Sequence, residues 1–201
     1  MITTIFFDLG KVLADFDWEE TSHKIAKDSH RAPEFIYEIC TNSPIALDYE
    51  AGRIITPVFF DRLKTEIGFT LSTGELKHLW SDIFTPNIRN ISILDTVRMT
   101  YPIGLISNTN EAHVEWISKK FHFLEWFSNP TYSYVTGYLK PQKEIFLQAL
   151  RANTVSPEES LFIDDLEQNA LAAKKLGMSA IHLTPDKDLA EELKQFDLNG
   201  I

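Results

Sequence analysis

The sequence is poor in cysteine and in positive charge. Its 201 residues include one cysteine, Cys40, which excludes an internal disulfide and any cysteine-rich zinc site. We interpret Cys40 as a small buried residue on an apolar helix face. The 19 Lys and Arg residues are outnumbered by 29 Asp and Glu residues, for a formal net charge of −10. Because an acidic surface repels phosphate backbones, we expect no nucleic-acid partner.

Long apolar runs are also absent. No stretch approaches the ~18 consecutive apolar residues of a membrane-spanning helix. The first residues, MITTIFFD, lack the basic start of a signal peptide, and their apolar run stops at Asp8. We therefore expect a cytoplasmic protein without a membrane partner. With 44% hydrophobic and 24% charged residues, the composition is that of a folded globular protein.

Short apolar runs alternate with helical patterns over much of the chain. The apolar runs are Ile2–Phe7, Ile103–Ile106, Leu161–Ile163 and Ala180–Leu183. Helical patterns lie at Glu111–Phe121, Gln142–Ala152 and Gln168–Leu176. Strands that alternate with helices of this length are typical of βαβ units. We therefore predict an α/β fold with a parallel sheet.

One segment has helical patterns and no strand-like run. The patterns are Trp18–Lys27, Pro33–Cys40, Pro57–Ile67 and Thr73–Phe84. We predict a helical domain over residues 17–86, inserted after the first strand of a core domain formed by residues 1–16 and 87–201. Tyr49 and Trp80 in this insert are candidates for lining a substrate pocket.

Polar residues end three of the four apolar runs. They are Asp8, then Ser107 and Asn108, then Asp164 and Asp165. Each taken alone has an ordinary explanation as a turn or helix cap. In open parallel sheets, however, ligands bind beyond the carboxyl ends of the strands. We therefore expect these groups to form three walls of one site.

The residue types indicate phosphate and metal chemistry. A strand-end carboxylate such as Asp8 can act as a nucleophile or a metal ligand. The adjacent carboxylates of Asp164 and Asp165 repel each other unless a cation or a lysine compensates, and oxygen-only ligands favour a hard ion such as Mg²⁺. The hydroxyl and amide of Ser107 and Asn108 can donate to phosphate. Lys140, just before Pro141, can supply a point charge.

The order of these groups resembles the haloacid dehalogenase superfamily of hydrolases. The match covers residues 1–16 and 87–200, and the helical insert resembles the C1 cap of that superfamily. The hexapeptide Asp-Leu-Gly-Lys-Val-Leu at 8–13 and Ser-Asn-Thr-Asn at 107–110 resemble the branch that contains bacterial sugar-phosphate phosphatases, including those for glucose 1-phosphate. The resemblance implies a Rossmann-like, doubly wound sheet with an inserted cap.

The resemblance also implies roles for individual residues. Asp8 would attack phosphorus and form a phosphoaspartate. Its carboxylate and the backbone carbonyl of Gly10 would bind Mg²⁺, with Asp165 as our first choice for the acidic ligand and Asp164 as the second. Ser107 and the backbone of Asn108 would hold phosphate oxygens, and Lys140 would offset negative charge. The expected function is thus magnesium-dependent hydrolysis of a small phosphorylated metabolite, with a sugar phosphate preferred.

The sequence departs from the superfamily at Gly10. Most phosphatases of this group carry an aspartate there as general acid and base, a role worth roughly 10²–10⁴ in rate. Without it we expect slow turnover, or substrates with good leaving groups such as sugar 1-phosphates and acyl phosphates. Asp15 and Asp17 lie close in sequence, but their position favours a flap or hinge over proton transfer.

Two other functions remain open from the sequence. One is a metal-free 2-haloacid dehalogenase that attacks carbon with Asp8. The other is a non-catalytic phosphoryl-binding regulatory protein, for which Gly10 is the best argument. We place His113 on a helix surface, and we expect a monomer or a homodimer.

Overall fold

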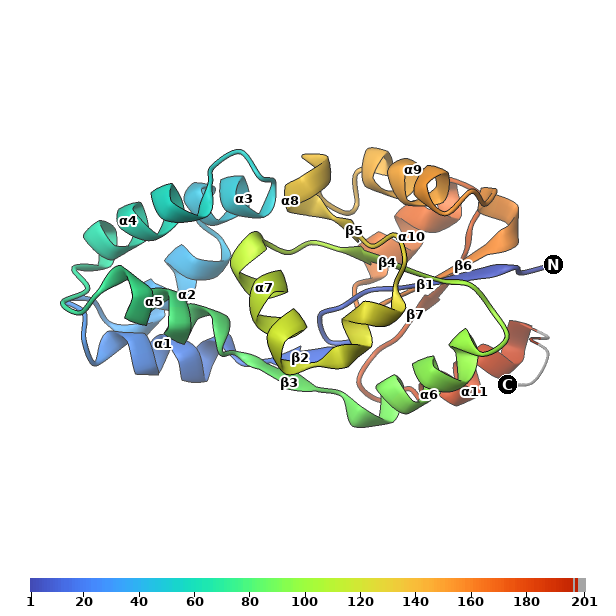
Figure 1. The fold of residues 1–201 in the computed structure, drawn as a ribbon, viewed down its shortest axis with the longest axis horizontal. Coiled ribbons are helices and arrows are strands. Elements are labelled where there is room, and N and C mark those ends of the chain that lie inside the picture. The colour runs from blue at the N-terminus through green and yellow to red at the C-terminus, as the bar shows by residue number, and fades with distance from the viewer. Residues whose placement is uncertain (197, 199–201) are drawn as a thin grey trace.

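A computed structural model describes residues 1–196 and 198 of the chain. Its centre is a five-stranded sheet with the order β5-β4-β1-β6-β7 (Figure 1). The strands are β1 (Thr4–Phe7), β4 (Ile103–Ser107), β5 (Thr131–Tyr132), β6 (Ser160–Asp164) and β7 (Ser179–His182). All neighbouring pairs run parallel. The predicted α/β fold with a parallel sheet is confirmed.

Helices cover both faces of this sheet. They are α6 (Ile88–Arg98), α7 (Glu111–Lys120), α8 (Ser133–Thr136), α9 (Lys143–Ala152), α10 (Glu167–Lys175) and α11 (Leu189–Leu193), with 3-10 turns at His122–Trp126, Pro157–Glu159 and Lys194–Phe196. Side chains alternate along β1, as in any strand. Ile5 and Phe7 enter an apolar cluster with Leu94 of α6, while Phe6 enters another with Phe146 of α9. The sheet is therefore doubly wound, with a separate apolar core on each face.

A short antiparallel ribbon joins the sheet to a helical insert. Strand β2 (Ala14–Phe16) pairs with β3 (Phe84–Pro86), and Asp15 lies opposite Thr85. We expected the insert to follow the first strand directly and its last helix to reach Phe84. The structure corrects both points, because helix α5 stops at Ser81 and the chain leaves and returns through the ribbon.

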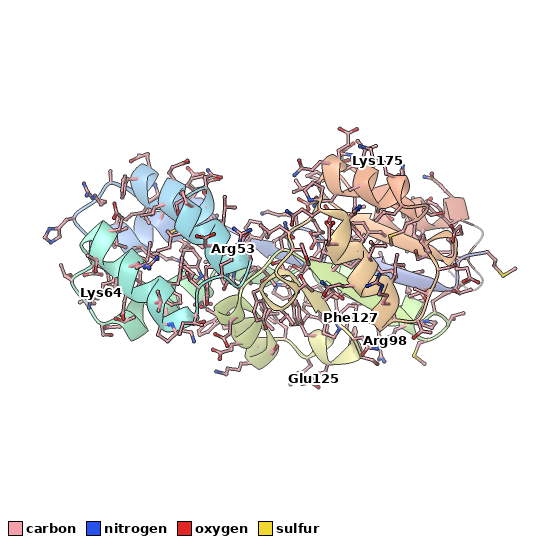
Figure 2. All side chains as sticks on the ribbon, turned by 90° about the horizontal axis from the view of Figure 1, so that it is seen from above. Arg53, Lys64, Arg98, Glu125, Phe127 and Lys175 are labelled. Atoms are coloured by element: carbon pink, nitrogen blue, oxygen red, sulfur yellow. The ribbon has the colours of Figure 1, made fainter. Side chains whose placement is uncertain are left out.

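Five helices of the insert, called the helical module below, gather at one end of the molecule (Figure 1). They are α1 (Trp18–Ala26), α2 (Pro33–Thr41), α3 (Pro44–Glu50), α4 (Thr56–Ile67) and α5 (Thr73–Ser81). Figure 2 shows the same division from above, with Arg53 and Lys64 on the module and Lys175 and Arg98 on the sheet part. None of the helices in the described residues is long and apolar enough to pass through a membrane.

The helical module has its own apolar core. Phe59 and Trp80 lie in it, and Cys40 is buried there as expected. Tyr49 stacks on Phe59 with ring centroids 4.2 Å apart. Tyr49 and Trp80 are each only 2% exposed, so our assignment of them to a pocket lining is wrong. Large aromatic side chains are more stable inside such a cluster than along a wet cleft.

The predicted domain boundaries at residues 16/17 and 86/87 fall in or next to the two strands of the ribbon. The division into domains stays a prediction. Residues 197 and 199–201 of the predicted core domain lie outside the described residues.

Candidate active site

Asp8 stands at the carboxyl end of β1, the central strand of the sheet. Its backbone N–H donates to the carbonyl of Ile163 (2.8 Å), and its carboxylate accepts the N–H of Leu9 (2.7 Å). The residue is 7% exposed. Burial, opposed by Lys140 and reinforced by Asp164, raises the pKa of Asp8 to about 7.

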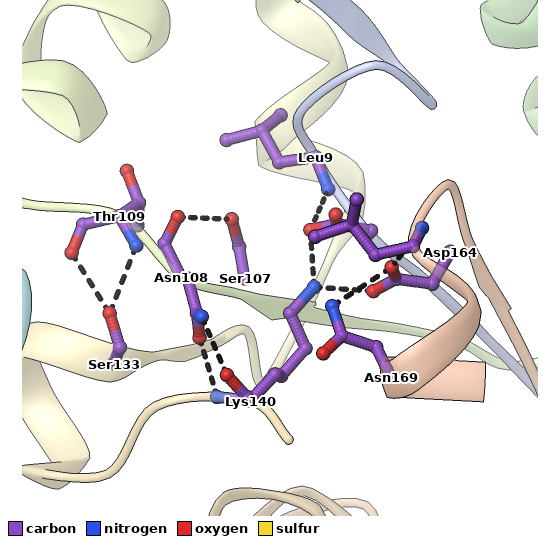
Figure 3. Close-up of polar contacts among 10 residues, drawn as sticks. Leu9, Ser107, Asn108, Thr109, Ser133, Lys140, Asp164 and Asn169 are labelled. Carbon is purple, nitrogen blue, oxygen red and sulfur yellow. Dashed lines mark hydrogen bonds and ion pairs between the residues drawn. The ribbon is translucent and has the colours of Figure 1, made fainter. Parts of the chain in front are cut away.

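Lys140 bridges two carboxylates at the same sheet edge (Figure 3). Its Nζ lies 2.7 Å from Oδ1 of Asp8 and 2.7 Å from Oδ2 of Asp164. Burial lowers the pKa of the Lys140 ammonium, but the two carboxylates outweigh burial and the net shift is upward. The lysine is therefore a fixed positive charge beside Asp8.

Asp164 ends β6 and is fully buried. Its Oδ1 accepts the backbone N–H of Leu166 (2.9 Å) and Nδ2 of Asn169 (2.9 Å), while Oδ2 faces Lys140. Asn169 stands one turn into α10, so this helix orients the carboxylate. The sequence alone did not reveal this bond between Asn169 and Asp164.

Three carboxylates meet at this point. One oxygen each from Asp8, Asp164 and Asp165 lies within 4.8 Å of the others. Burial, together with the neighbouring Asp164, raises the pKa of Asp165. Asp165 is only partly buried and also lines an open cleft with Lys11 and other polar side chains. Three carboxylates facing one ammonium leave excess negative charge, which an oxygen-liganded divalent cation would balance.

The loop after β4 forms the other wall. Ser107 is buried at the end of β4, and its hydroxyl makes one long contact, 3.4 Å, to the carbonyl of Asn108. The Asn108 side chain clamps the lysine backbone, donating to the Lys140 carbonyl (3.0 Å) and accepting its N–H (2.7 Å). Asn108 therefore positions Lys140, a link between distant segments that the sequence did not show.

The structure thus brings Asp8, Ser107, Asn108, Lys140 and the acidic pair to one sheet edge. A family model of haloacid dehalogenase-like hydrolases matches residues 2–177. The chain belongs to the haloacid dehalogenase-like hydrolase family.

Two relatives of this hydrolase are named as phosphatases. The D-ribitol-5-phosphate phosphatase of Bacteroides thetaiotaomicron is 28% identical over 200 residues, which cover 96% of this chain and 97% of the relative. A sesquiterpene phosphatase of Aspergillus oryzae is 27% identical over 172 residues, covering 77% and 80% of the two chains. The chain also resembles a crystal structure of a haloacid dehalogenase family enzyme from B. thetaiotaomicron in complex with magnesium and inorganic phosphate. The two structures superpose with a TM-score of 0.86 and 27% sequence identity, over 96% of this chain and 99% of the other.

Gly10 of the hydrolase lies against an aromatic ring. A Cβ added to Gly10 would stand 2.9 Å from Cε1 of Phe16. Lys11 fixes that ring, because its Nζ lies 4.5 Å above the ring centroid and donates to the Phe16 carbonyl (2.7 Å). The space for a side chain at position 10 is therefore occupied. Asp15 is exposed on β2, and Asp17 caps α1 by accepting the N–H of Glu20 (2.8 Å).

His113 is buried, so its expected place on a helix surface is wrong. Its ring stacks on Trp80 at 5.6 Å between centroids, and Phe84 meets it edge-on at 4.9 Å. Nδ1 lies 3.0 Å from Nδ2 of Asn110, and Nε2 lies 3.3 Å from the Trp80 carbonyl. Burial lowers the pKa of His113 to about 3. The reason is that α7 packs its inner face on the helical module, which covers the ring.

Proposed function

We propose that this hydrolase is a magnesium-dependent phosphatase of small phosphorylated metabolites, with a sugar or polyol phosphate as the preferred class. The observation that carries the proposal is the buried Lys140 ammonium between Asp8 and Asp164, beside the partly exposed Asp165. Such a site combines a carboxylate that can act as a nucleophile, an ammonium that can attract an anionic phosphate, and further carboxylates that can bind a cation. Similarity along nearly the whole chain to a D-ribitol-5-phosphate phosphatase supports this substrate class.

The residues present fit a magnesium ion. The carboxylates of Asp8 and Asp165 and the carbonyl of Gly10 would hold it. Both oxygens of Asp164 already accept hydrogen bonds, from Leu166 and Asn169 on one side and Lys140 on the other, which favours Asp165 as the direct ligand. When bound, the ion supplies Lewis-acid stabilisation of charge on phosphate oxygens.

The proposed reaction uses the groups that the chain itself supplies. The Asp8 carboxylate attacks phosphorus while the bond from phosphorus to the ester oxygen breaks, so the alcohol leaves and a phosphoaspartate forms. Water then attacks this phosphorus, which releases inorganic phosphate and restores Asp8. Lys140 offsets negative charge on Asp8 and on the phosphoryl group. The Ser107 hydroxyl and the Asn108 backbone hold phosphate oxygens. Residues 17–86 act as a cap that limits bulk water and selects the substrate.

The direct test is phosphate release from p-nitrophenyl phosphate, with Mg²⁺ and then with excess chelator. The nitrophenolate leaving group needs no proton, so Gly10 does not mask activity. We expect release with Mg²⁺, loss of release with chelator, and no release by Asp8→Asn. Asp61→Asn, an exposed change on α4, serves as the matched control. Wild-type rates in Asp8→Asn, or release that survives chelation, would contradict the proposal.

A further inference from the structure

The loop between β4 and α7 carries the groups that the proposed phosphatase uses to hold phosphate. The Ser107 hydroxyl at its start makes only one long contact, 3.4 Å to the carbonyl of Asn108, so it can still bind a ligand. Groups that hold a reacting phosphoryl have to stay in place, because a shift of about 1 Å can cost about 10²-fold in rate. The contacts that fix this loop therefore matter for the proposed reaction.

The two asparagines of the loop are fixed by their side chains. Asn108 clamps the backbone of Lys140, as described above. The Asn110 side chain accepts the N–H of His113 (3.0 Å) and thereby caps α7. These contacts hold the loop on either side of Thr109, and the backbone of Thr109 itself needs another partner.

That partner is the hydroxyl of Ser133, the first residue of α8 (Figure 3). Ser133 is fully buried. Its Oγ accepts the N–H of Thr109 (2.9 Å) and lies 3.0 Å from the Thr109 carbonyl. It also lies 2.7 Å from the carbonyl of Glu50. A hydroxyl has one proton and two lone pairs, so Ser133 accepts the buried N–H and donates its proton to one of the two carbonyls.

The sheet brings Ser133 to this place. Strand β5 pairs with β4, and Tyr132 lies opposite Ser107 in the register. Ser133 follows Tyr132 directly, so the end of one parallel strand delivers its hydroxyl to the loop that leaves the neighbouring strand. The position of Ser133 beside the loop is thus set by backbone pairing and not by a flexible side chain.

The helical module holds Ser133 from the other side. Glu50, whose carbonyl contacts the Ser133 hydroxyl, is the last residue of α3. A Cβ added to Gly52 would lie 2.0 Å from the carbonyl of Tyr134, so the turn after α3 rests directly on the residue that follows Ser133. Ser133 is therefore confined between the module and the loop.

We propose that Ser133 is a positioning residue for the phosphate-binding loop. This inference rests on the proposed phosphatase function. The hydroxyl is occupied by its backbone partners, so it acts through Thr109, keeping the Ser107 hydroxyl and the Asn108 backbone in place. An alanine at position 133 leaves the buried Thr109 N–H without an acceptor, and the loop has to shift to satisfy it. The carboxylates of the opposite wall do not contact Ser133 and keep their positions.

The test compares Ser133→Ala with Ser92→Ala, an exposed change on α6, in three measurements. They are kcat for p-nitrophenyl phosphate, the inhibition constant of inorganic phosphate with Mg²⁺ present, and the dissociation constant of Mg²⁺ by calorimetry without phosphate. For Ser133→Ala we expect kcat to fall by roughly 10–10²-fold and the phosphate inhibition constant to rise at least about fivefold. The Mg²⁺ constant should stay at the wild-type value. Ser92→Ala should match the wild type in all three.

A purely structural role would not separate phosphate from magnesium in this way. The inference is overturned if Ser133→Ala keeps the wild-type kcat and phosphate constant, or if it weakens phosphate and Mg²⁺ by the same factor. Should Ser133→Ala be unfolded at the assay temperature, Ser133→Cys takes its place, because a thiol keeps the shape of the side chain but forms only weak hydrogen bonds. The same separation is then required. If the wild type releases no phosphate from p-nitrophenyl phosphate, the proposed function itself fails, whereas failure of the Ser133 inference leaves wild-type activity intact.

Discussion

Replacing Gly10 by alanine tests whether the Phe16 ring closes the space at that position. The new Cβ would lie 2.9 Å from Cε1 of Phe16, whereas carbon atoms pack best at about 3.5–4.0 Å. The ring edge would have to retreat by roughly 0.5–1 Å to restore that spacing. Phe84 meets the ring edge-on at 6.1 Å between centroids, and Lys11 covers its face, so retreat is opposed from two sides.

Two effects of opposite sign set the magnitude for Gly10→Ala. Overpacking costs about 1–3 kcal/mol, and the lower entropy of the unfolded alanine chain returns about 0.4–1 kcal/mol. Phe16 is only half-buried and can yield in part, so we expect a net loss of about 0.5–2 kcal/mol in the free energy of unfolding. Urea denaturation of Gly10→Ala, Phe16→Ala and the double variant measures the coupling between the positions. We expect the double variant to recover about 1 kcal/mol relative to the sum of the single changes.

The same contact predicts the outcome of Gly10→Asp. The aspartate has no room beside Phe16, so we expect the single change to gain no activity on an alkyl phosphate, whose leaving group needs a proton, while Gly10→Asp with Phe16→Ala gains some. Additive urea data, or a stabilising Gly10→Ala, would refute the steric argument. A gain of activity in Gly10→Asp alone would refute it as well.

Two further predictions concern pH and metal. The pKa of His113 is about 3 in the folded protein and about 6.5 in the unfolded chain. The unfolded state therefore binds more protons below pH 6.5. The contribution of the neutral His113 ring to the free energy of unfolding is thus present above pH 6.5 and is lost as the pH falls toward 3. Between pH 7.5 and pH 5 the wild type should lose about 2 kcal/mol more than His113→Phe, measured by urea denaturation at each pH, and parallel curves would contradict this. Mg²⁺ at a hundred times its dissociation constant should stabilise the protein by about 2.7 kcal/mol, a gain that chelator reverses and Asp165→Asn reduces. Equal shifts of Tm in the wild type and Asp165→Asn, with Asp61→Asn as control, would argue against the proposed ligand.

The elements that could be predicted from the sequence are those that carry a local signal. The four apolar runs became β1, β4, β6 and β7, because parallel strands buried on both faces read as continuous apolar stretches. The polar residues at the ends of three of them lie together in the candidate site, since parallel strands deliver their carboxyl ends to one edge.

What the sequence missed depends on contacts between distant segments. The ribbon pairs residues 14–16 with 84–86, and β5 has only two residues, Thr131 and Tyr132, so neither shows a pattern of its own. The short helix α3 was also missed. The sequence could not show that Trp80 packs on His113 and buries it. It also could not show that the Phe16 ring occupies the space where a side chain at position 10 would lie.

The packing of α7 on the helical module has a consequence for how the chain is made and for how it can be recombined. Ala112 completes the apolar core of the module, and His113 stacks on Trp80, although both follow β4 in the chain. During synthesis the apolar core of the module therefore stays incomplete after α5 has been made, and it is completed only when the residues of α7 leave the ribosome. A chimaera that transplants residues 17–86 onto a relative would not include Ala112 and His113, which pack on the module. A functional graft has to carry the start of α7 with it.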